Sequence, residues 1–131
     1  MIGARKKYGS VQNAMATWRD YMVSMGFGYT LGVDLPGEAS PIAYTKANMG
    51  ELDLATTSFG QNISVSILHM ATIYSTIANG GYLMKPYIVE EVKSSDGTVI
   101  SKTEPVVKRQ VISSKTATEM MSVLYDTVNT G

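Results

Sequence analysis

Apolar residues recur at three- and four-residue intervals in three stretches of the chain, which is the spacing of an amphipathic helix. The first stretch runs from Val11 to the glycines at 26 and 28, which are expected to end the helix. Ser10 stands before it as an N-cap, because its hydroxyl can accept a hydrogen bond from a first-turn N–H. The stripe expected to be buried comprises Val11, Ala14, Met15, Trp18, Met22 and Met25.

The second stretch begins after Ser64 or Ser66 and ends at Gly80-Gly81, because glycine supplies the left-handed residue that closes a helix. We expect its apolar face to be buried and its polar face to be exposed. The apolar face comprises Ile67, Met70, Ala71, Tyr74, Ile77 and Ala78, and the polar face comprises His69, Thr72, Thr76 and Asn79. The third helix begins after Ser113, with Ala117, Met120, Met121, Leu124 and Val128 on its expected buried side.

Between the second and third helices the pattern favours β-structure. Residues 82–92 are rich in strand formers, and Ser95-Asp96-Gly97 is a hairpin signal before residues 98–101. A further short strand is expected within residues 106–112. Pro86 and Pro105 mark strand beginnings or edges, because proline has no N–H to donate to a neighbouring strand.

The region between the first two helices is expected to be mostly irregular. Pro36-Gly37 and Pro41 interrupt residues 26–64, and a loop of that length is uncommon inside a compact domain. The fold class is therefore α+β, with three main helices and a small antiparallel β-hairpin. One hairpin of this size cannot cover three helices, so the pattern predicts a portion of a larger fold.

Composition narrows the classes of function. The chain has 131 residues, of which 44% are hydrophobic and 17% charged, as in an ordinary globular domain. Eleven basic and eleven acidic residues give a net charge of zero, so no nucleic-acid partner is expected. There is no cysteine, which excludes disulfides, thiolate nucleophiles and cysteine-bound zinc. No apolar run is long enough to span a membrane and the N-terminus lacks the pattern of an export signal, so we expect a soluble chain without a membrane segment.

Candidate chemical groups favour structural roles. The glycines at 26, 28 and 32 do not have the spacing of a nucleotide-binding loop, and they follow a helix, so a structural turn is favoured. His69, the single histidine, is expected to be a solvated or hydrogen-bonded surface residue rather than a metal ligand or a base. The carboxylates of Glu38, Glu51 and Asp53 could form an acid–base pair, but exposed loop positions are the default.

Two other features also have structural explanations. Most of the nine methionines lie on the stripes expected to be buried, which favours core packing over an adaptable binding surface. In Ser113-Ser114-Lys115 the serines precede lysine by one and two positions, not the three that a serine–lysine catalytic pair on a helix needs. Helix capping is the better account of Ser113. We assign no catalytic, cofactor-binding or metal-binding residue, and no cofactor.

Several segments, in order, resemble the transpeptidase domain of class B penicillin-binding proteins, the bacterial enzymes that cross-link peptidoglycan. They are Gly26-Phe27-Gly28 with LGVDLPGE at 31–38, SFGQNISV at 58–65, IANGG at 77–81, MKPYIV at 84–89 with Asp96-Gly97, and Val111-Ile112-Ser113 with the last helix. The resemblance covers nearly all of residues 10–131. It departs from the family at Asn62, where glycine is usual, and at Ile67, where proline is frequent. Asparagine tolerates a positive φ, so the turn at 62 can persist.

The resemblance implies serine acyl transfer, yet the motifs that carry it are absent. The family uses S-x-x-K for its nucleophile and lysine, S-x-N, and a K-[ST]-G strand. None of these three motifs occurs in the 131 residues, and neither Lys102-Thr103-Glu104 nor Lys115-Thr116-Ala117 has the required glycine. By the order of the family, residues 1–131 correspond to the part of the domain between S-x-N and K-[ST]-G.

The resemblance thus predicts a scaffold portion of a D,D-transpeptidase that is inactive alone. The parent would bind peptidoglycan stem peptides and β-lactams, and would be anchored in the bacterial cytoplasmic membrane with this domain outside it. The portion could associate with itself through faces left uncovered. Two alternatives remain: a stand-alone non-enzymatic module that binds a protein or a glycan, and a small metal- or nucleotide-dependent enzyme resting on His69 and the glycine loop.

Overall fold

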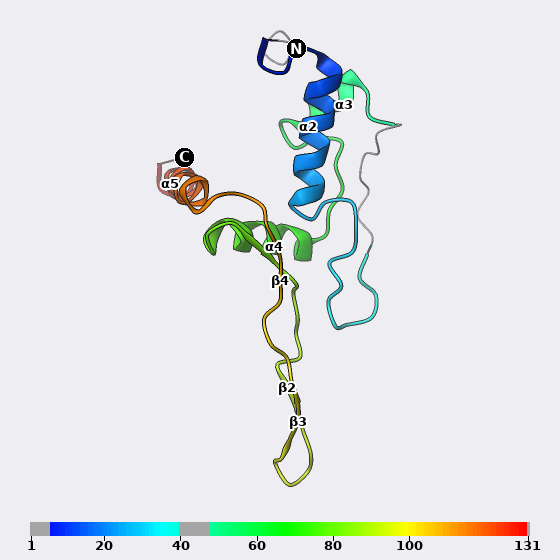
Figure 1. The fold of residues 1–131 in the computed structure, drawn as a ribbon, viewed down its shortest axis with the longest axis vertical. Helices are drawn as coiled ribbons and strands as arrows, with labels where there is room; N and C mark the ends of the chain where they lie inside the picture. The colour runs from blue at the N-terminus through cyan, green and yellow to red at the C-terminus, as the bar shows by residue number, and fades with distance from the viewer. Residues whose placement is uncertain (1–5, 40–47, 131) are drawn as a thin grey trace.

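The computed structural model describes residues 6–39 and 48–130, so Pro41 lies outside the described residues. Figure 1 shows helices gathered at one end and a narrow β-arm extending from the other. The helices are α2 (Val11–Ser24), α3 (Glu51–Thr57), α4 (Ile67–Ala78) and α5 (Ser114–Thr130). The strands are β1 (Tyr82–Met84), β2 (Glu91–Lys93), β3 (Val99–Lys102) and β4 (Val107–Gln110). The predicted α+β class is confirmed.

Helix α2 begins and ends as its sequence predicts. The Ser10 hydroxyl accepts from the N–H of Asn13 at 3.0 Å, and Gly26 and Gly28 follow the helix with positive φ. Val11, Ala14 and Met22, all from the predicted stripe, are buried. The predicted start and end of this helix are thus confirmed, and the rest of the stripe, Met15, Trp18 and Met25, is half-buried.

Helix α3 was not expected, because residues 26–64 read as irregular. It has seven residues, too few for an amphipathic pattern to be visible. Glu51 and Asp53 lie in its first turn, where the helix dipole favours negative charge. The Asp53 carboxylate also accepts from the N–H of Gly50 at 2.8 Å, which satisfies a donor that the helix leaves unpaired.

Helix α4 has the predicted bounds, but most of its buried residues lie on the face predicted to be exposed. The Ser66 hydroxyl accepts from the N–H of His69, so Ser66 is the N-cap. Ile67 is 89% exposed and Tyr74 50% exposed, whereas the buried residues are His69, Thr72, Thr76 and Ile77. The predicted faces were therefore wrong at most positions, although Ile77 is buried and Asn79 is exposed as predicted. His69 lies inside because it binds the Tyr29 carbonyl of the loop at 29–38.

Burial of these threonines is possible because their hydroxyls bond within the helix. Thr72 donates to the carbonyl of Leu68 and Thr76 donates to that of Thr72, each at 2.8 Å. A buried hydroxyl without a partner would cost free energy, and these two have one. The polar side of α4 can therefore face the interior.

Helix α5 packs against the core along one narrow side. Ala117 is buried and Leu124 is partly buried, both against Ile77 and Ile112. Met120, Met121 and Val128 are 37%, 43% and 83% exposed, so the predicted burial of those three was wrong. Ala117 and Leu124 make the contact of α5 with Ile77 and Ile112, and those three side chains lie outside that contact.

The strands form two small antiparallel ladders in place of the one hairpin expected. β1 pairs with β4, with Leu83 opposite Arg109, and β2 pairs with β3, with Glu91 opposite Lys102. The predicted turn is confirmed, because the N–H of Ser94 donates to the carbonyl of Thr98 at 2.9 Å across Asp96-Gly97. β4 ends at Gln110, earlier than the predicted strand. Leu83 and Leu31, at 0% and 1% exposure, are the most buried leucines.

Candidate functional site

The loop at residues 29–38, which we call the clasp loop, makes hydrogen bonds to α4, to β4 and to residues 88–89. Glu38 organises it, because its carboxylate accepts from three successive backbone N–H groups, those of Leu31, Gly32 at 2.8 Å and Val33 at 3.2 Å. Burial raises the pKa of Glu38, but these three hydrogen bonds outweigh it and the pKa lies below its usual 4.5. Glu38 is thus a structural carboxylate rather than a general acid.

Two cations of β4 attach the clasp loop to the β1–β4 ladder. Lys108 Nζ donates to the carbonyl of Leu31 at 2.5 Å, and Arg109 donates to the Tyr29 hydroxyl at 2.6 Å. Both cations also lie 5.6 Å from the centre of the Tyr29 ring, within cation–π distance. Burial lowers the pKa of Lys108, while the Glu38 charge opposes that shift. Nothing in the local sequence pattern pointed to this contact.

His69 attaches the clasp loop to α4. Its Nε2 lies 3.0 Å from the carbonyl oxygen of Tyr29, and its Nδ1 lies 2.7 Å from the Ser66 hydroxyl. Because a carbonyl oxygen can only accept, Nε2 carries the proton and Nδ1 accepts from Ser66. His69 is 1% exposed, so the prediction of a surface residue was wrong, although the predicted hydrogen-bonded role is correct.

The other predicted carboxylates do not join Glu38. Glu51 and Asp53 lie on α3 and not in a loop, and Asp53 accepts both from Gly50 and from the Asn62 amide at 3.0 Å. Across residues 6–39 and 48–130 no three histidines, cysteines or acidic residues are grouped closely enough to hold a metal ion. Asp53 and Glu38 thus have separate structural partners.

The remaining sequence candidates are also structural. The glycines at 26, 28 and 32 all have positive φ, as a turn requires, and the Gly32 N–H is already bound by Glu38. Ser113 caps α5 as predicted, since its hydroxyl accepts from the N–H of Thr116 at 3.1 Å. Within the described part of the chain, no helix combines the length and apolarity needed to cross a bilayer.

An apolar groove of about 830 Å³ lies between α2, α4 and α5. Trp18 lies in its wall and donates its indole N–H to the Thr57 hydroxyl at 3.0 Å. Four methionines contribute, which leaves a soft and polarisable lining. The methionines are Met22, Met25, Met70 and Met120. Predicted as core residues, they line a groove instead, and only Met22 is buried.

A second pocket, of about 400 Å³, separates α4 from the chain that leads into the β-arm. Thr72, Ser75 and Asn79 of α4 form one wall, and Pro86 and Pro105 belong to the opposite one. Ser75 and Lys85 both line this pocket, but they are ten positions apart and do not have the spacing of a serine–lysine catalytic pair on a helix.

Comparison with known proteins gives these elements a context. The family model described as penicillin binding protein transpeptidase domain matches residues 6–131. Stage V sporulation protein D of Bacillus subtilis is 35% identical over 112 residues, covering 85% of this chain and 17% of that protein. Penicillin-binding protein 2A of the same organism is 38% identical over 105 residues, covering 76% of this chain and 14% of that protein. The chain therefore spans less than a fifth of either relative.

Solved structures agree. Penicillin-binding protein 2B of Streptococcus pneumoniae aligns with a TM-score of 0.74 at 26% identity, over 88% of this chain and 19% of that one. Penicillin binding protein 3 of Mycobacterium tuberculosis, complexed with aztreonam, aligns with a TM-score of 0.70 at 28% identity, over 78% of this chain and 22% of that one. The helices and the arm are thus arranged as in these proteins.

Proposed function

The chain belongs to the penicillin-binding protein transpeptidase family, and from this premise we propose that it is the scaffold portion of a peptidoglycan D,D-transpeptidase. It corresponds to the region between the S-x-N and K-[ST]-G motifs. The main support for this proposal is that the family's LGVDLPGE segment forms the clasp loop. In addition, S-x-x-K, S-x-N and K-[ST]-G do not occur in residues 1–131.

In the whole enzyme, a serine hydroxyl would attack the D-Ala-D-Ala amide of a stem peptide. The C–N bond breaks, D-alanine leaves with a proton, and an acyl ester forms on serine. The amine of a neighbouring strand then displaces the serine and forms the cross-link. A β-lactam amide would react at the same serine. Residues 1–131 would form part of the scaffold around the active site. The domain would be anchored to the cytoplasmic membrane and would lie on its outer side.

We expect the chain of residues 1–131 to be inactive alone, because it offers neither the nucleophile nor its lysine. The test is incubation with a fluorescent penicillin, followed by denaturing electrophoresis. A class B penicillin-binding protein treated in parallel should give a labelled band, whereas this chain should give none. A stoichiometric band that survives denaturation would contradict the proposal.

The 830 Å³ groove favours a second candidate, a non-enzymatic module that binds a partner protein or a glycan. The two candidates differ in solution behaviour. A stand-alone binding module should unfold cooperatively as a monomer or a defined oligomer. A scaffold portion of a larger domain should be marginally stable and prone to non-specific association. Calorimetry with light scattering on the same sample separates them.

A further inference from the structure

The β2–β3 hairpin projects from the body as an arm (Figure 1). Every residue of both strands is exposed, and within the described chain neither strand packs on a helix or on another strand outside the pair. Residues 85–90 and 103–106 connect the arm to the β1–β4 ladder. Burial of apolar surface therefore cannot set the direction of the arm, and hydrogen bonds at its root must do so.

Asp34 of the clasp loop makes the contact that joins this root to the body. One carboxylate oxygen accepts from the N–H of Ile88 at 2.8 Å, and the other accepts from the N–H of Val89 at 2.9 Å. Two adjacent donors on one carboxylate fix orientation as well as distance. The same two hydrogen bonds lower the pKa of Asp34, so the group stays charged at neutral pH.

Thr103 makes a different kind of contact at the same root. Its hydroxyl donates to the carbonyl of Val89 at 2.6 Å, and its N–H donates to the carbonyl of Glu90 at 2.8 Å. These bonds join the two connecting segments to each other, so they hold the arm together without tying it to the body. Asp34 thus binds the N–H of Val89, and Thr103 binds its carbonyl.

The clasp loop that carries Asp34 is held by further hydrogen bonds. Glu38 binds the N–H groups immediately before it, including that of Val33, and Lys108 holds the carbonyl of Leu31. The connecting segments also form one wall of the 400 Å³ pocket through Pro86, Tyr87 and Pro105. A change in the direction of the arm would therefore move that wall away from α4 or towards it.

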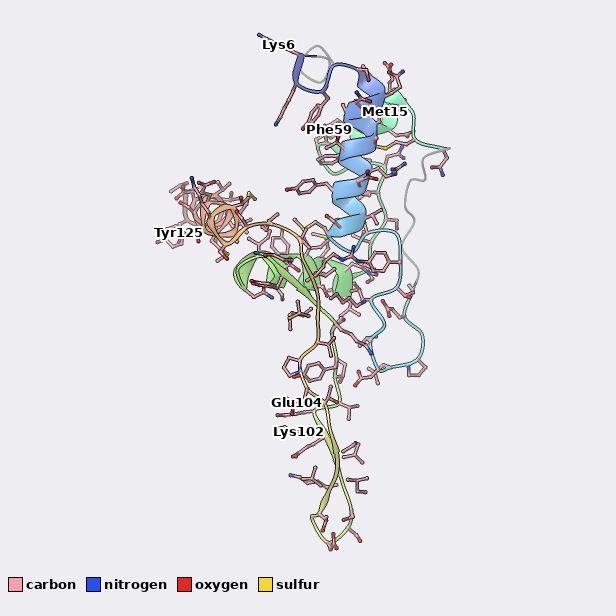
Figure 2. The ribbon with its side chains drawn as sticks, viewed as in Figure 1. Lys6, Met15, Phe59, Lys102, Glu104 and Tyr125 are labelled. Atoms are coloured by element: carbon pink, nitrogen blue, oxygen red, sulfur yellow. The ribbon has the colours of Figure 1, made fainter. Side chains whose placement is uncertain are left out.

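We propose that Asp34 is a clasp that fixes the direction of the β2–β3 arm and, through the arm's root, the width of the pocket beside α4. The clasp is a positioning device built into the fold, and it does not depend on whether the chain belongs to an active transpeptidase. Figure 2 labels Lys102 and Glu104 at the arm's root and shows how far the hairpin extends beyond them.

The test measures the position of the arm against α4. Because the chain has no cysteine, Ser101→Cys on the arm and Ala78→Cys on α4 give two unique spin-label sites. Pulsed electron paramagnetic resonance should report one narrow distance distribution in the doubly labelled chain that keeps Asp34. In Asp34→Asn, which replaces one acceptor oxygen by a donor, the distribution should broaden at least twofold. Amide exchange at Ile88 and Val89 should accelerate at least tenfold.

The matched control is Asp96→Asn, which loosens the turn at the arm's tip instead of its root. It should accelerate exchange at Thr98 and leave Ile88 and Val89 unchanged. If Asp34→Asn lost the folded circular dichroism spectrum, Asp34→Glu, which keeps the charge and shifts it by one methylene, would take its place. The proposal would be overturned if the Asp34 variant that folds had the same distance distribution and the same exchange rates as the chain that keeps Asp34. Equal broadening in the Asp34 and Asp96 variants would overturn it as well.

Discussion

The imidazole of His69 donates to the carbonyl of Tyr29, forty residues earlier in the chain, at 3.0 Å. This single bond joins the first turn of α4 to the start of the clasp loop. The Ser66 hydroxyl holds the other ring nitrogen, so the ring is bound on both sides inside the molecule. A polar residue can be this deeply buried because each of its donors and acceptors is satisfied.

Replacing His69 by alanine should therefore be costly. The substitution removes two hydrogen bonds, leaves the Tyr29 carbonyl without that donor, and opens a cavity. We expect the free energy of unfolding to fall by about 2–4 kcal/mol. Ile67→Ala, two positions earlier and 89% exposed, is the control and should change the free energy of unfolding by less than about 0.5 kcal/mol. Urea unfolding followed by circular dichroism measures both. Equal effects would show that the His69 contact contributes little.

Gly81 provides a test of backbone packing at the junction of α4 and β1. It has φ +99°, and a Cβ built there would lie 2.1 Å from the carbonyl oxygen of Ile112. Gly81→Ala must therefore move the backbone before α5, and we expect a loss of more than about 3 kcal/mol. Gly97→Ala has similar φ but open space around its Cβ, so strain alone should cost about 1 kcal/mol. Thermal unfolding of the pair separates clash from strain, and equal losses would contradict the clash.

The sequence identified the long helices but not always their inner faces. Bounds follow from local chemistry, such as the Ser10 and Ser66 caps and the Gly80-Gly81 end, and those predictions held. Burial depends on what packs against a helix, which a periodic pattern does not state. The apolar side of α4 was therefore assigned to the interior, whereas the threonine side is buried. α3 was missed because seven residues carry too little pattern.

The clasp loop shows why most of the site could not be predicted. Asp34 binds N–H groups 54 and 55 residues away, and Lys108 reaches a carbonyl 77 residues away. Backbone groups have no side-chain signature, so no spacing in the sequence marks such partners. The available signal was the LGVDLPGE segment itself, whose two carboxylates both proved to bind backbone N–H groups. Asn62 was predictable because its tolerance of positive φ is intrinsic.

Asn62 has φ +61°, which confirms that asparagine keeps the turn open where the family usually has glycine. Asn62→Gly relieves the strain and loses the hydrogen bond to Asp53, so stability should change by less than about 1 kcal/mol. Asn62→Val loses both the tolerance of positive φ and the hydrogen bond to Asp53. It should lower the free energy of unfolding by about 1–2 kcal/mol, because a β-branched residue resists this conformation. Urea unfolding compares the two, and a valine variant as stable as the glycine variant would contradict this account.

Acid should weaken the fold in a defined range. The Ser94 hydroxyl and then the Thr98 N–H lower the pKa of Asp96 from 3.8 to about 2, and backbone hydrogen bonds lower those of Asp34 and Glu38. A carboxyl with a folded pKa below its unfolded value contributes stability that is complete above the unfolded value. That contribution disappears as pH falls through the folded value.

The unfolding midpoint should therefore be constant above about pH 5 and decline between about pH 4 and pH 2. Carboxyl carbon resonances, followed by NMR over this range, should place the Asp96 titration near 2. Asp96→Asn should flatten part of the decline without removing it, because Asp34 and Glu38 still titrate. A midpoint independent of pH down to 2 would contradict these assignments.

Exposed apolar surface on α5 should make the chain associate with itself. The solvent-accessible area is 8764 Å², whereas a compact monomer of this 14.2 kDa mass exposes roughly 6,800 Å². Met121 and Val128, seven positions apart and therefore on one side of α5, contribute to the excess with 43% and 83% exposure. Such a face is unfavourable in water and is covered when two copies meet.

Sedimentation velocity should show a dimer or larger species that grows as concentration rises over tens of micromolar. The double variant Met121→Lys with Val128→Lys should reduce the associated fraction several-fold, because it places two charges where apolar side chains would meet. Ser122→Lys adds a charge at an exposed polar position of the same helix and should leave association unchanged. If the unsubstituted chain were monomeric at every concentration, α5 would be excluded as the surface through which copies associate. It would also be excluded if the double lysine variant and Ser122→Lys changed association equally.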